Sequence, residues 1–319
     1  MEQTPLAWSK LGAHLADADK AREYMEFLRW GNAGPACPHC GGADPYKLMP
    51  KAGSARPGRK GLYKCRIAQC RKQFTVTVGT VFEDSHIPLN KWLQAIYLMG
   101  ASKKGISAHQ LHRMLGLTYR SAWFMAHRLR YAMSVEPLAS KLSGVVEVDE
   151  VYIGGKRKGG RGRMPADGGR KAAVVALVQR GGDVRSFPME RIDGHSMDAT
   201  ILRHVDTANA QIMTDDTTIY GGRTRLYGAP RHSVAHARGE FVRGDAHTNT
   251  AEGFFSLLKR GIVGTFHHVG KGHLGKYVSE FEFRYNARKI GDAQRPLLIV
   301  HGAEGKRLTY KQPAGASAN

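Results

Sequence analysis

The sequence predicts an α/β protein whose second half folds as a mixed sheet with helices, preceded by a small cysteine-containing module and further helices. Three observations support this prediction. Strand-like and helical segments alternate after residue 142, four cysteines occur as two pairs before residue 71, and two short helices with capping residues lie between these regions. The 319 residues are enough for two or three domains with a sizeable core.

The chain is basic along its whole length. It has 48 Lys and Arg residues against 27 Asp and Glu residues, and both halves share the resulting net charge of +21. This excess indicates a polyanionic partner, and nucleic acid is favoured over a membrane because the sequence has no amphipathic basic helix or lipidation signal. The alternative is a basic surface that only keeps the protein in solution.

The sequence also indicates a compartment. No apolar run reaches the length of a transmembrane helix, and residues 1–12 lack the apolar core of a signal peptide. We therefore expect a cytoplasmic protein. Its cysteines should be reduced there, which favours metal binding over disulfides.

Residues 1–30 have apolar side chains at loosely helical spacing, and residues 31–84 are predicted to form a zinc ribbon. The ribbon contains every cysteine of the chain in two pairs, Cys37 with Cys40 and Cys65 with Cys70. Two such pairs, each holding one edge of a tetrahedral site, predict one structural Zn²⁺, and the alternative is free buried thiols. Because residues 47–72 include nine basic and no acidic side chains, this module is expected to lie on phosphates.

Residues 85–135 are predicted to contain a helix-turn-helix. Ser107 and Thr118 stand where they can cap two successive helices, and Gly116 lies in the short turn between them. This is the order of elements by which many proteins place a recognition helix in the major groove of DNA. The alternative is a compact three-helix bundle with no role in DNA binding.

Two segments of the chain are expected to contact DNA directly. One is the second helix of this pair, over residues 118–133, and the other is a loop over residues 154–171 with seven glycines and seven basic residues. The alternative for the loop is a disordered surface insertion. The side chains proposed for these contacts are Arg120, Arg128, Lys156, Arg157 and Lys158.

The second domain is expected over residues 140–300, with a tail over residues 301–319. Its first element is a buried strand over residues 144–155, rich in β-branched side chains and bounded by glycines. A helix capped by Ser196 and a second helix that starts near Asn249 are also predicted. The remaining strands are predicted over residues 172–178, 184–189 and 211–214.

Two aspartates in this domain are candidate metal ligands. Asp149 lies within the apolar first strand, where a carboxylate is costly unless it is paired or binds a metal. Asp215 follows the strand over residues 211–214, and its alternative role is to cap the helix after it. Mg²⁺ binds several carboxylate oxygens at one point, and phosphoryl transfer uses such cations. The pair therefore indicates a nucleic-acid-processing site.

A third polar position is predicted on the helix that starts near Asn249. Asn249, Glu252, Ser256 and Lys259 recur at helical spacing and form a polar stripe opposite the apolar face. The alternative is a capping box, with Asn249 as the N-cap and Glu252 three residues later. Periodicity alone leaves both interpretations open.

Together these segments resemble bacterial insertion-sequence transposases of the family catalogued as insertion sequence fifteen ninety-five, which have an amino-terminal zinc ribbon and an Asp-Asp-Asn or Asp-Asp-Glu catalytic domain. The resemblance runs in order from about residue 30 to residue 290. Its motifs are Cys37-Pro-His-Cys40, Cys70-Arg-Lys-Gln-Phe-Thr, Gly79-Thr-Val-Phe82, Leu117-Thr-Tyr-Arg-Ser-Ala-Trp-Phe-Met125, Val148-Asp-Glu-Val-Tyr-Ile-Gly-Gly155, Thr214-Asp215, His247-Thr-Asn249, Glu252-Gly-Phe-Phe-Ser-Leu-Leu-Lys-Arg260 and Glu280-Phe-Glu-Phe-Arg-Tyr-Asn-Ala-Arg288.

The resemblance implies a ribonuclease-H-like catalytic domain and a transposase that cuts the ends of its element and joins the 3′-hydroxyl ends to target DNA. It implies two catalytic Mg²⁺ ions, which Mn²⁺ can replace, with Asp149, Asp215 and Asn249 as ligands. Glu252 is the alternative third ligand, and Lys259 is the basic residue downstream of it. The implied partners are the terminal inverted repeats, target DNA and at least one more copy of the chain on DNA.

Two other classes of protein are weighed against this interpretation. A DNA-binding regulator would use the same amino-terminal modules with an inactive second half. A site-specific recombinase would need a Ser or Tyr nucleophile, and Tyr285 is the candidate for it. The spacing of Tyr285 with Tyr277 and Phe281 on one helical face predicts packing instead.

Overall fold

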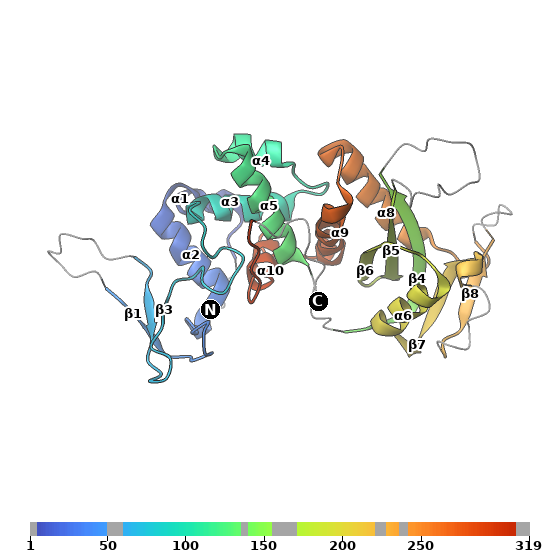
Figure 1. Cartoon of the computed structure of the whole chain (residues 1–319), viewed down its shortest axis with the longest axis horizontal. Coiled ribbons are helices and arrows are strands. Elements are labelled where there is room, and N and C mark those ends of the chain that lie inside the picture. Colours follow the sequence, from blue (N-terminus) through green and yellow to red (C-terminus); the bar gives the residue numbers. More distant parts are fainter. Residues whose placement is uncertain are drawn as a thin grey trace. The chain divides into compact units, whose positions relative to one another are not determined.

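The computed structural model divides the chain into two units. Unit 1 comprises Met1–Ser134 with Lys289–Asn319, and unit 2 comprises Val135–Arg288. No helix in the described part of the chain is long and apolar enough to cross a membrane. Figure 1 shows the helices and strands of both units, and the structure describes residues 5–49, 60–134, 140–154, 171–220, 228–235 and 242–310.

Unit 1 contains a three-stranded antiparallel sheet in the order β1-β2-β3. A small aromatic core supports it, in which the ring of Tyr63 stacks on Phe74 at 5.7 Å and the edge of Trp30 meets both rings. The third strand has only two residues and ends at Phe74, and turns follow it. The strands are β1 (Pro45–Lys47), β2 (Tyr63–Cys65) and β3 (Gln73–Phe74).

Helices make up the rest of unit 1. Asp17 accepts hydrogen bonds from two backbone N–H groups at the start of α2, so the predicted helix over residues 1–30 is broken there. The last helix among the described residues, α10, packs against α2, α3 and α5. The helical elements are η1 (Trp8–Lys10), α1 (Gly12–Ala16), α2 (Ala18–Trp30), η2 (Gly31–Ala33), α3 (Leu89–Ala101), α4 (Ala108–Leu115), α5 (Tyr119–Met133) and α10 (Arg295–His301).

The turn between α4 and α5 has the capping residues that the sequence predicts. The Ser107 hydroxyl accepts the N–H of Gln110, and the Thr118 hydroxyl accepts the N–H of Ser121. Gly116 ends α4 in the left-handed conformation, with φ +60°. Because these interactions are local, the sequence alone specifies where both helices begin.

Residues 289–310 also belong to unit 1. The prediction divided them between the second domain and a tail, but α10 is buried against other helices of unit 1. Beyond it, the ring of Tyr310 meets Phe124 of α5 edge-on at 5.5 Å, and Leu308 is buried. Packing at a large sequence separation therefore places this end of the chain.

Unit 2 is built on the predicted mixed sheet, which has five strands in the order β6-β5-β4-β7-β8. The pairs β4–β5 and β5–β6 are antiparallel, whereas β4–β7 and β7–β8 are parallel. The central strand is therefore β4, which begins at Leu142. The strands are β4 (Leu142–Ile153), β5 (Ala172–Gln179), β6 (Val184–Met189), β7 (Val205–Asp215) and β8 (Arg231–Val234).

Helices cover both faces of this sheet (Figure 1). On one face, Val151 and Ile153 of β4 join a core with α8 and α9, and on the other Val146 and Val148 pack with α6. Asp193, not Ser196, is the N-cap of α6; Ser196 lies at N3 and completes the capping box. The elements are α6 (Gly194–His204), η3 (Thr218–Tyr220), α8 (Asn249–Gly261), the π-helical turn η5 (Ile262–Phe266), α9 (Lys271–Asn286) and η6 (Ala287–Lys289).

Candidate functional site

Four cysteine sulfurs in unit 1 converge on one point. All four Sγ atoms lie within 4.8 Å of one another, and Cys37–Cys70 and Cys40–Cys65 are 3.8 and 3.6 Å apart. A tetrahedron with Zn–S bonds of ~2.3 Å has edges of ~3.8 Å, so these thiols fit Zn²⁺. In the described ranges, no other group of three or more His, Cys, Asp or Glu side chains is close enough to share a metal.

The two candidate aspartates lie on adjacent parallel strands of unit 2. Residue Glu147 of β4 is opposite Met213 of β7, and Asp149 and Asp215 each stand two residues further along their strands. In a parallel pair, equal steps along both strands lead to the same edge of the sheet. The sheet therefore brings the two predicted carboxylates to matching positions.

Asp149 is half-buried on β4, and its Oδ1 accepts the N–H of Glu150 at 2.8 Å. Burial raises the pKa of Asp149 to about 7, although the hydrogen bond from Glu150 opposes the shift. The negative charges of Glu150, Asp215 and Glu252 raise it further. The neighbouring acids thus disfavour the ionised form of Asp149, an effect that a bound cation would reverse.

Asp215 is half-buried at the end of β7. Its Oδ1 accepts hydrogen bonds from the N–H and the hydroxyl of Thr217, at 3.3 and 2.9 Å, just before η3. These bonds go to the residue that precedes η3, so they form a local turn, and Asp215 is not the N-cap that the sequence left open as an alternative. The neighbouring Asp216 is exposed.

The polar stripe on α8 is present as predicted. Asn249, Glu252, Ser256 and Lys259 are all exposed, whereas the opposite face of the helix is buried in the core shared with β4 and β5. The alternative capping box is not observed. Thr248 is the N-cap and makes no side-chain capping bond, and Asn249 is the first helical residue.

Three residues beside these acids were not singled out from the sequence. Glu147 is completely buried and accepts hydrogen bonds from the first turn of α8. The buried Tyr220 donates its hydroxyl to Glu150 Oε2 at 2.8 Å, and burial with the charge of Glu150 raises the pKa of Tyr220. Arg231 donates to the Thr214 hydroxyl at 3.0 Å. An acid two positions before Asp149, on the same strand face, was the available signal for Glu147.

The predicted DNA-contacting arginines of α5 have different surroundings. Arg120 is exposed at the start of the helix, where its Nε donates to the Tyr310 hydroxyl at 2.7 Å. Arg128 is only 6% exposed, and it donates to the backbone carbonyls of Leu308 and Glu83. The burial of Arg128 does not fit a contact with DNA. Lys156, Arg157 and Lys158 lie outside the described residues.

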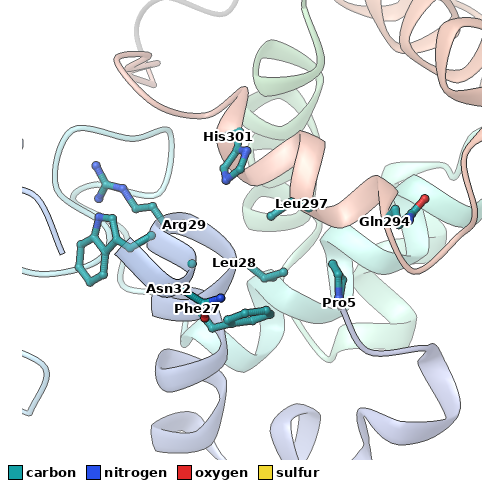
Figure 2. A pocket seen from close by; sticks show the side chains of 10 residues that line it. Pro5, Phe27, Leu28, Arg29, Asn32, Gln294, Leu297 and His301 are labelled. Carbon is teal, nitrogen blue, oxygen red and sulfur yellow. The ribbon is translucent and has the colours of Figure 1, made fainter. Parts of the chain in front are cut away.

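A separate cavity of about 580 Å³ lies in unit 1, beside α2 and α10 (Figure 2). Among its lining residues, only Arg29 is a Lys, Arg, Asp or Glu. The Nη1 atom of Arg29 donates to the carbonyls of Val76 and Val78. None of the predicted site residues lines this cavity, and it offers no group of acids for a metal. The lining residues are Pro5, Phe27, Leu28, Arg29, Trp30, Gly31, Asn32, Gln294, Leu297 and His301.

Comparison with known proteins gives two family matches. Residues 141–286 match the ISXO2-like transposase domain, and residues 16–73 match the transposase zinc-ribbon domain. The chain is also 28% identical over 280 residues to an uncharacterized protein in transposable element ISH50 of Halobacterium salinarum, which covers 83% of this chain and 90% of that protein. The first match contains both candidate aspartates and α8, and the second contains all four cysteines.

Proposed function

We propose that this chain is a transposase of the ISXO2-like kind, which cuts DNA at the ends of an insertion sequence and joins the freed 3′-hydroxyl groups to target DNA. One observation carries the proposal: Asp149 and Asp215 occupy matching positions on the parallel strands β4 and β7. The pKa of Asp149, raised to about 7 by burial and by neighbouring acids, is consistent with a site for a divalent cation. The mixed five-stranded sheet is compatible with a ribonuclease-H-like domain.

In this proposal Asp149 and Asp215 each give a carboxylate oxygen to Mg²⁺, and Asn249 gives its amide oxygen. When bound, two Mg²⁺ ions neutralise charge on the attacking and leaving oxygens of the scissile phosphate, and Mn²⁺ accepts the same oxygen ligands. Lys259 is exposed two to three turns along the same face of α8, where its ammonium can bind a DNA phosphate. Glu252 supports Asn249 or replaces it as the third ligand.

Unit 1 is proposed to bind the terminal repeats. Zn²⁺ held by the four cysteines stabilises the small three-stranded sheet, and α4 with α5 forms the helix-turn-helix that reads the DNA. Arg120, exposed at the start of α5, is proposed to contribute sequence preference, and the loop over residues 154–171 only general affinity. Both DNA ends must be held together, so at least two copies are expected to assemble on DNA.

The test is cleavage of a plasmid that carries both ends of the element. We expect Asp149→Asn and Asp215→Asn to lower the rate of Mg²⁺-dependent cleavage by more than about 100-fold, because each removes a charge that holds the cation. Asp216→Asn is the matched control, since Asp216 is an exposed acid next to Asp215. Normal cleavage by either site variant would exclude this site.

The same assay separates the other classes of protein. Binding to end DNA without cleavage under any metal condition would support a regulator instead. A covalent protein–DNA adduct would support a tyrosine recombinase. The surroundings of Tyr285 argue against the latter, because its ring packs edge-on against Phe254 at 5.7 Å and lies under the guanidinium of Arg288.

A further inference from the structure

We propose that Glu147 is a positioning residue for the metal site: it holds the first turn of α8 and thereby fixes Asn249 and Glu252 relative to Asp149. The inference rests on the proposed function, because it concerns the same site. It assigns a role to a buried acid that the proposed chemistry does not itself use.

The carboxylate of Glu147 caps α8 from a different element. Its Oε2 accepts the N–H groups of Thr250 and Ala251 at 2.7 and 2.9 Å, and its Oε1 accepts the Thr250 hydroxyl at 2.8 Å. N–H groups in the first turn of a helix have no partner within the helix. The Thr248 side chain does not cap these N–H groups, and Glu147 supplies their acceptor from β4.

Arg180 ties the segment before the helix to the same carboxylate. Its Nε donates to Glu147 Oε1 at 2.6 Å, and its other two nitrogens donate to the carbonyls of Asp245 and His247 at 2.9 and 3.0 Å. The Nδ1 atom of His247 lies 3.3 Å from the same Oε1. One ion pair thus fixes the chain on both sides of the start of α8, and the negative charge also suits the helix dipole.

Burying the Glu147 carboxylate costs free energy, and what it provides in return is the attachment of α8 to β4. Glu147 is 0% exposed, and a buried carboxylate loses its hydration. A Ser or Asp at the N-cap would satisfy the same N–H groups at the surface, but it would leave the helix end unattached to the sheet. A carboxylate on β4 instead fixes the position of the helix end along the strand.

The position of Glu147 connects it to the proposed ligands. Glu147 and Asp149 are two residues apart on β4, so their side chains share one face of the sheet. Asn249 directly precedes Thr250, and it is exposed, so its own packing does not fix it. Metal ligands need to be held within about 0.5 Å of their working positions, which the bonds of Glu147 to the helix backbone can provide.

The experiment compares Glu147→Gln with Glu282→Gln in the full chain at pH 8. Glu282 of α9 is the matched control: it is also buried, and it accepts hydrogen bonds from the N–H and the hydroxyl of Ser186 on the edge strand β6. Mn²⁺ affinity is measured by electron paramagnetic resonance, and amide exchange at Thr250 and Ala251 by NMR. We expect Glu147→Gln to weaken Mn²⁺ binding by roughly 10- to 100-fold and to speed exchange, and Glu282→Gln to change affinity by less than about twofold.

If Glu147→Gln does not fold, a second pair of variants tests whether Glu147 positions the start of α8. Thr250→Val removes the hydroxyl that Glu147 accepts, and Thr250→Ser keeps it. We expect the valine variant to bind Mn²⁺ several-fold more weakly and the serine variant to bind it normally.

The outcomes separate this inference from the proposed function. Wild-type Mn²⁺ affinity in both Glu147→Gln and Thr250→Val, or equal losses in Glu147→Gln and Glu282→Gln, would overturn the positioning role alone. A wild-type protein that binds no Mn²⁺, or whose Mn²⁺ binding survives Asp149→Asn, would overturn the proposed site and the positioning role with it.

Discussion

Asn249 and Glu252 are one turn apart on the exposed face of α8. Glu252 lies close enough for its charge to raise the pKa of Asp149. A carboxylate binds Mg²⁺ more strongly than an amide does, whereas the family resemblance favours Asn at this position. The absence of the predicted capping box removes one alternative role for Asn249.

We predict that Asn249→Ala abolishes metal-dependent cleavage, whereas Asn249→Glu retains it, because glutamate supplies an oxygen at the same place. Glu252→Ala should reduce cleavage only in part, as expected for a residue that supports the ligand. The measurement is Mg²⁺- and Mn²⁺-dependent cleavage of end DNA by variants first checked for folding. Near-normal cleavage by Asn249→Ala, together with an inactive Glu252→Ala, would make Glu252 the ligand.

Asp149 should make the stability of the metal-free protein depend on pH. The pKa is about 7 in the folded chain, from burial first, against 3.8 for an ordinary aspartate. Folding therefore favours the protonated acid, and this contribution to stability is full below pH ~4 and is lost as the pH rises to about 7. Asp149→Asn cannot ionise, so it should avoid that loss.

We predict that Asp149→Asn unfolds at the same temperature as the wild type near pH 4 and at a higher temperature at pH 8 without metal. At about 1.4 kcal/mol for each pKa unit, the difference is of the order of 2–4 kcal/mol. Added Mg²⁺ should reduce this difference in the free energy of unfolding, because it stabilises only the wild type. Thermal melts at both pH values check this, with Asp216→Asn as the exposed control, and a gap that does not change with pH would contradict it.

At the scale of elements, the three-stranded sheet of unit 1 is expected to depend on a metal held by its cysteines. Its core has four fully buried side chains, of which two are the cysteines Cys37 and Cys65. This small number of apolar groups cannot offset the conformational entropy lost when the surrounding segments become ordered. The metal is therefore expected to contribute folding free energy directly.

We predict one Zn²⁺ per chain, lost in Cys65→Ser together with binding to the element ends. Unit 2 should remain folded in this variant, because its core shares no residue with the cysteine site. Metal analysis and end-DNA binding are the measurements, and Mn²⁺ affinity serves as the control for unit 2. A zinc-free wild type, or normal binding by Cys65→Ser, would exclude the structural role of the metal.

At the scale of the whole molecule, the net charge of +21 is divided between both halves of the chain. Each phosphate that a Lys or Arg neutralises releases counterions, so affinity for duplex DNA falls steeply with salt.

We predict that binding to non-cognate duplex weakens by roughly 10³- to 10⁵-fold between 50 and 200 mM salt, the range expected for 6–10 phosphate contacts. The measurement is a titration at several salt concentrations without divalent metal. Arg120→Ala provides a comparison, because it should reduce the preference for end DNA more than it reduces general affinity. A flat salt dependence would mean that the basic surface does not contact the phosphates.

The sequence by itself determined those features that depend on residues close together in the chain. The β-branched residues around Asp149, bounded by glycines, identified β4, the hydroxyls of Ser107 and Thr118 identified the starts of α4 and α5, and the paired cysteines identified the candidate zinc site. The prediction was less accurate where two nearby residues could both serve as the N-cap of a helix: the N-cap of α6 is Asp193 and not Ser196. The capping bonds and the spacing within each cysteine pair involve residues at most five positions apart, so they can be recognised in the sequence.

Only the tertiary structure decided which distant residues meet. Arg128 is buried and donates hydrogen bonds to the carbonyls of Leu308 and Glu83, and α10 packs against the other helices of unit 1. The tertiary structure also brings Glu147 to the first turn of α8, 103 residues later in the chain. The physical reason is that a buried charge is stable only where packing delivers its partners, and no local spacing encodes partners so far apart.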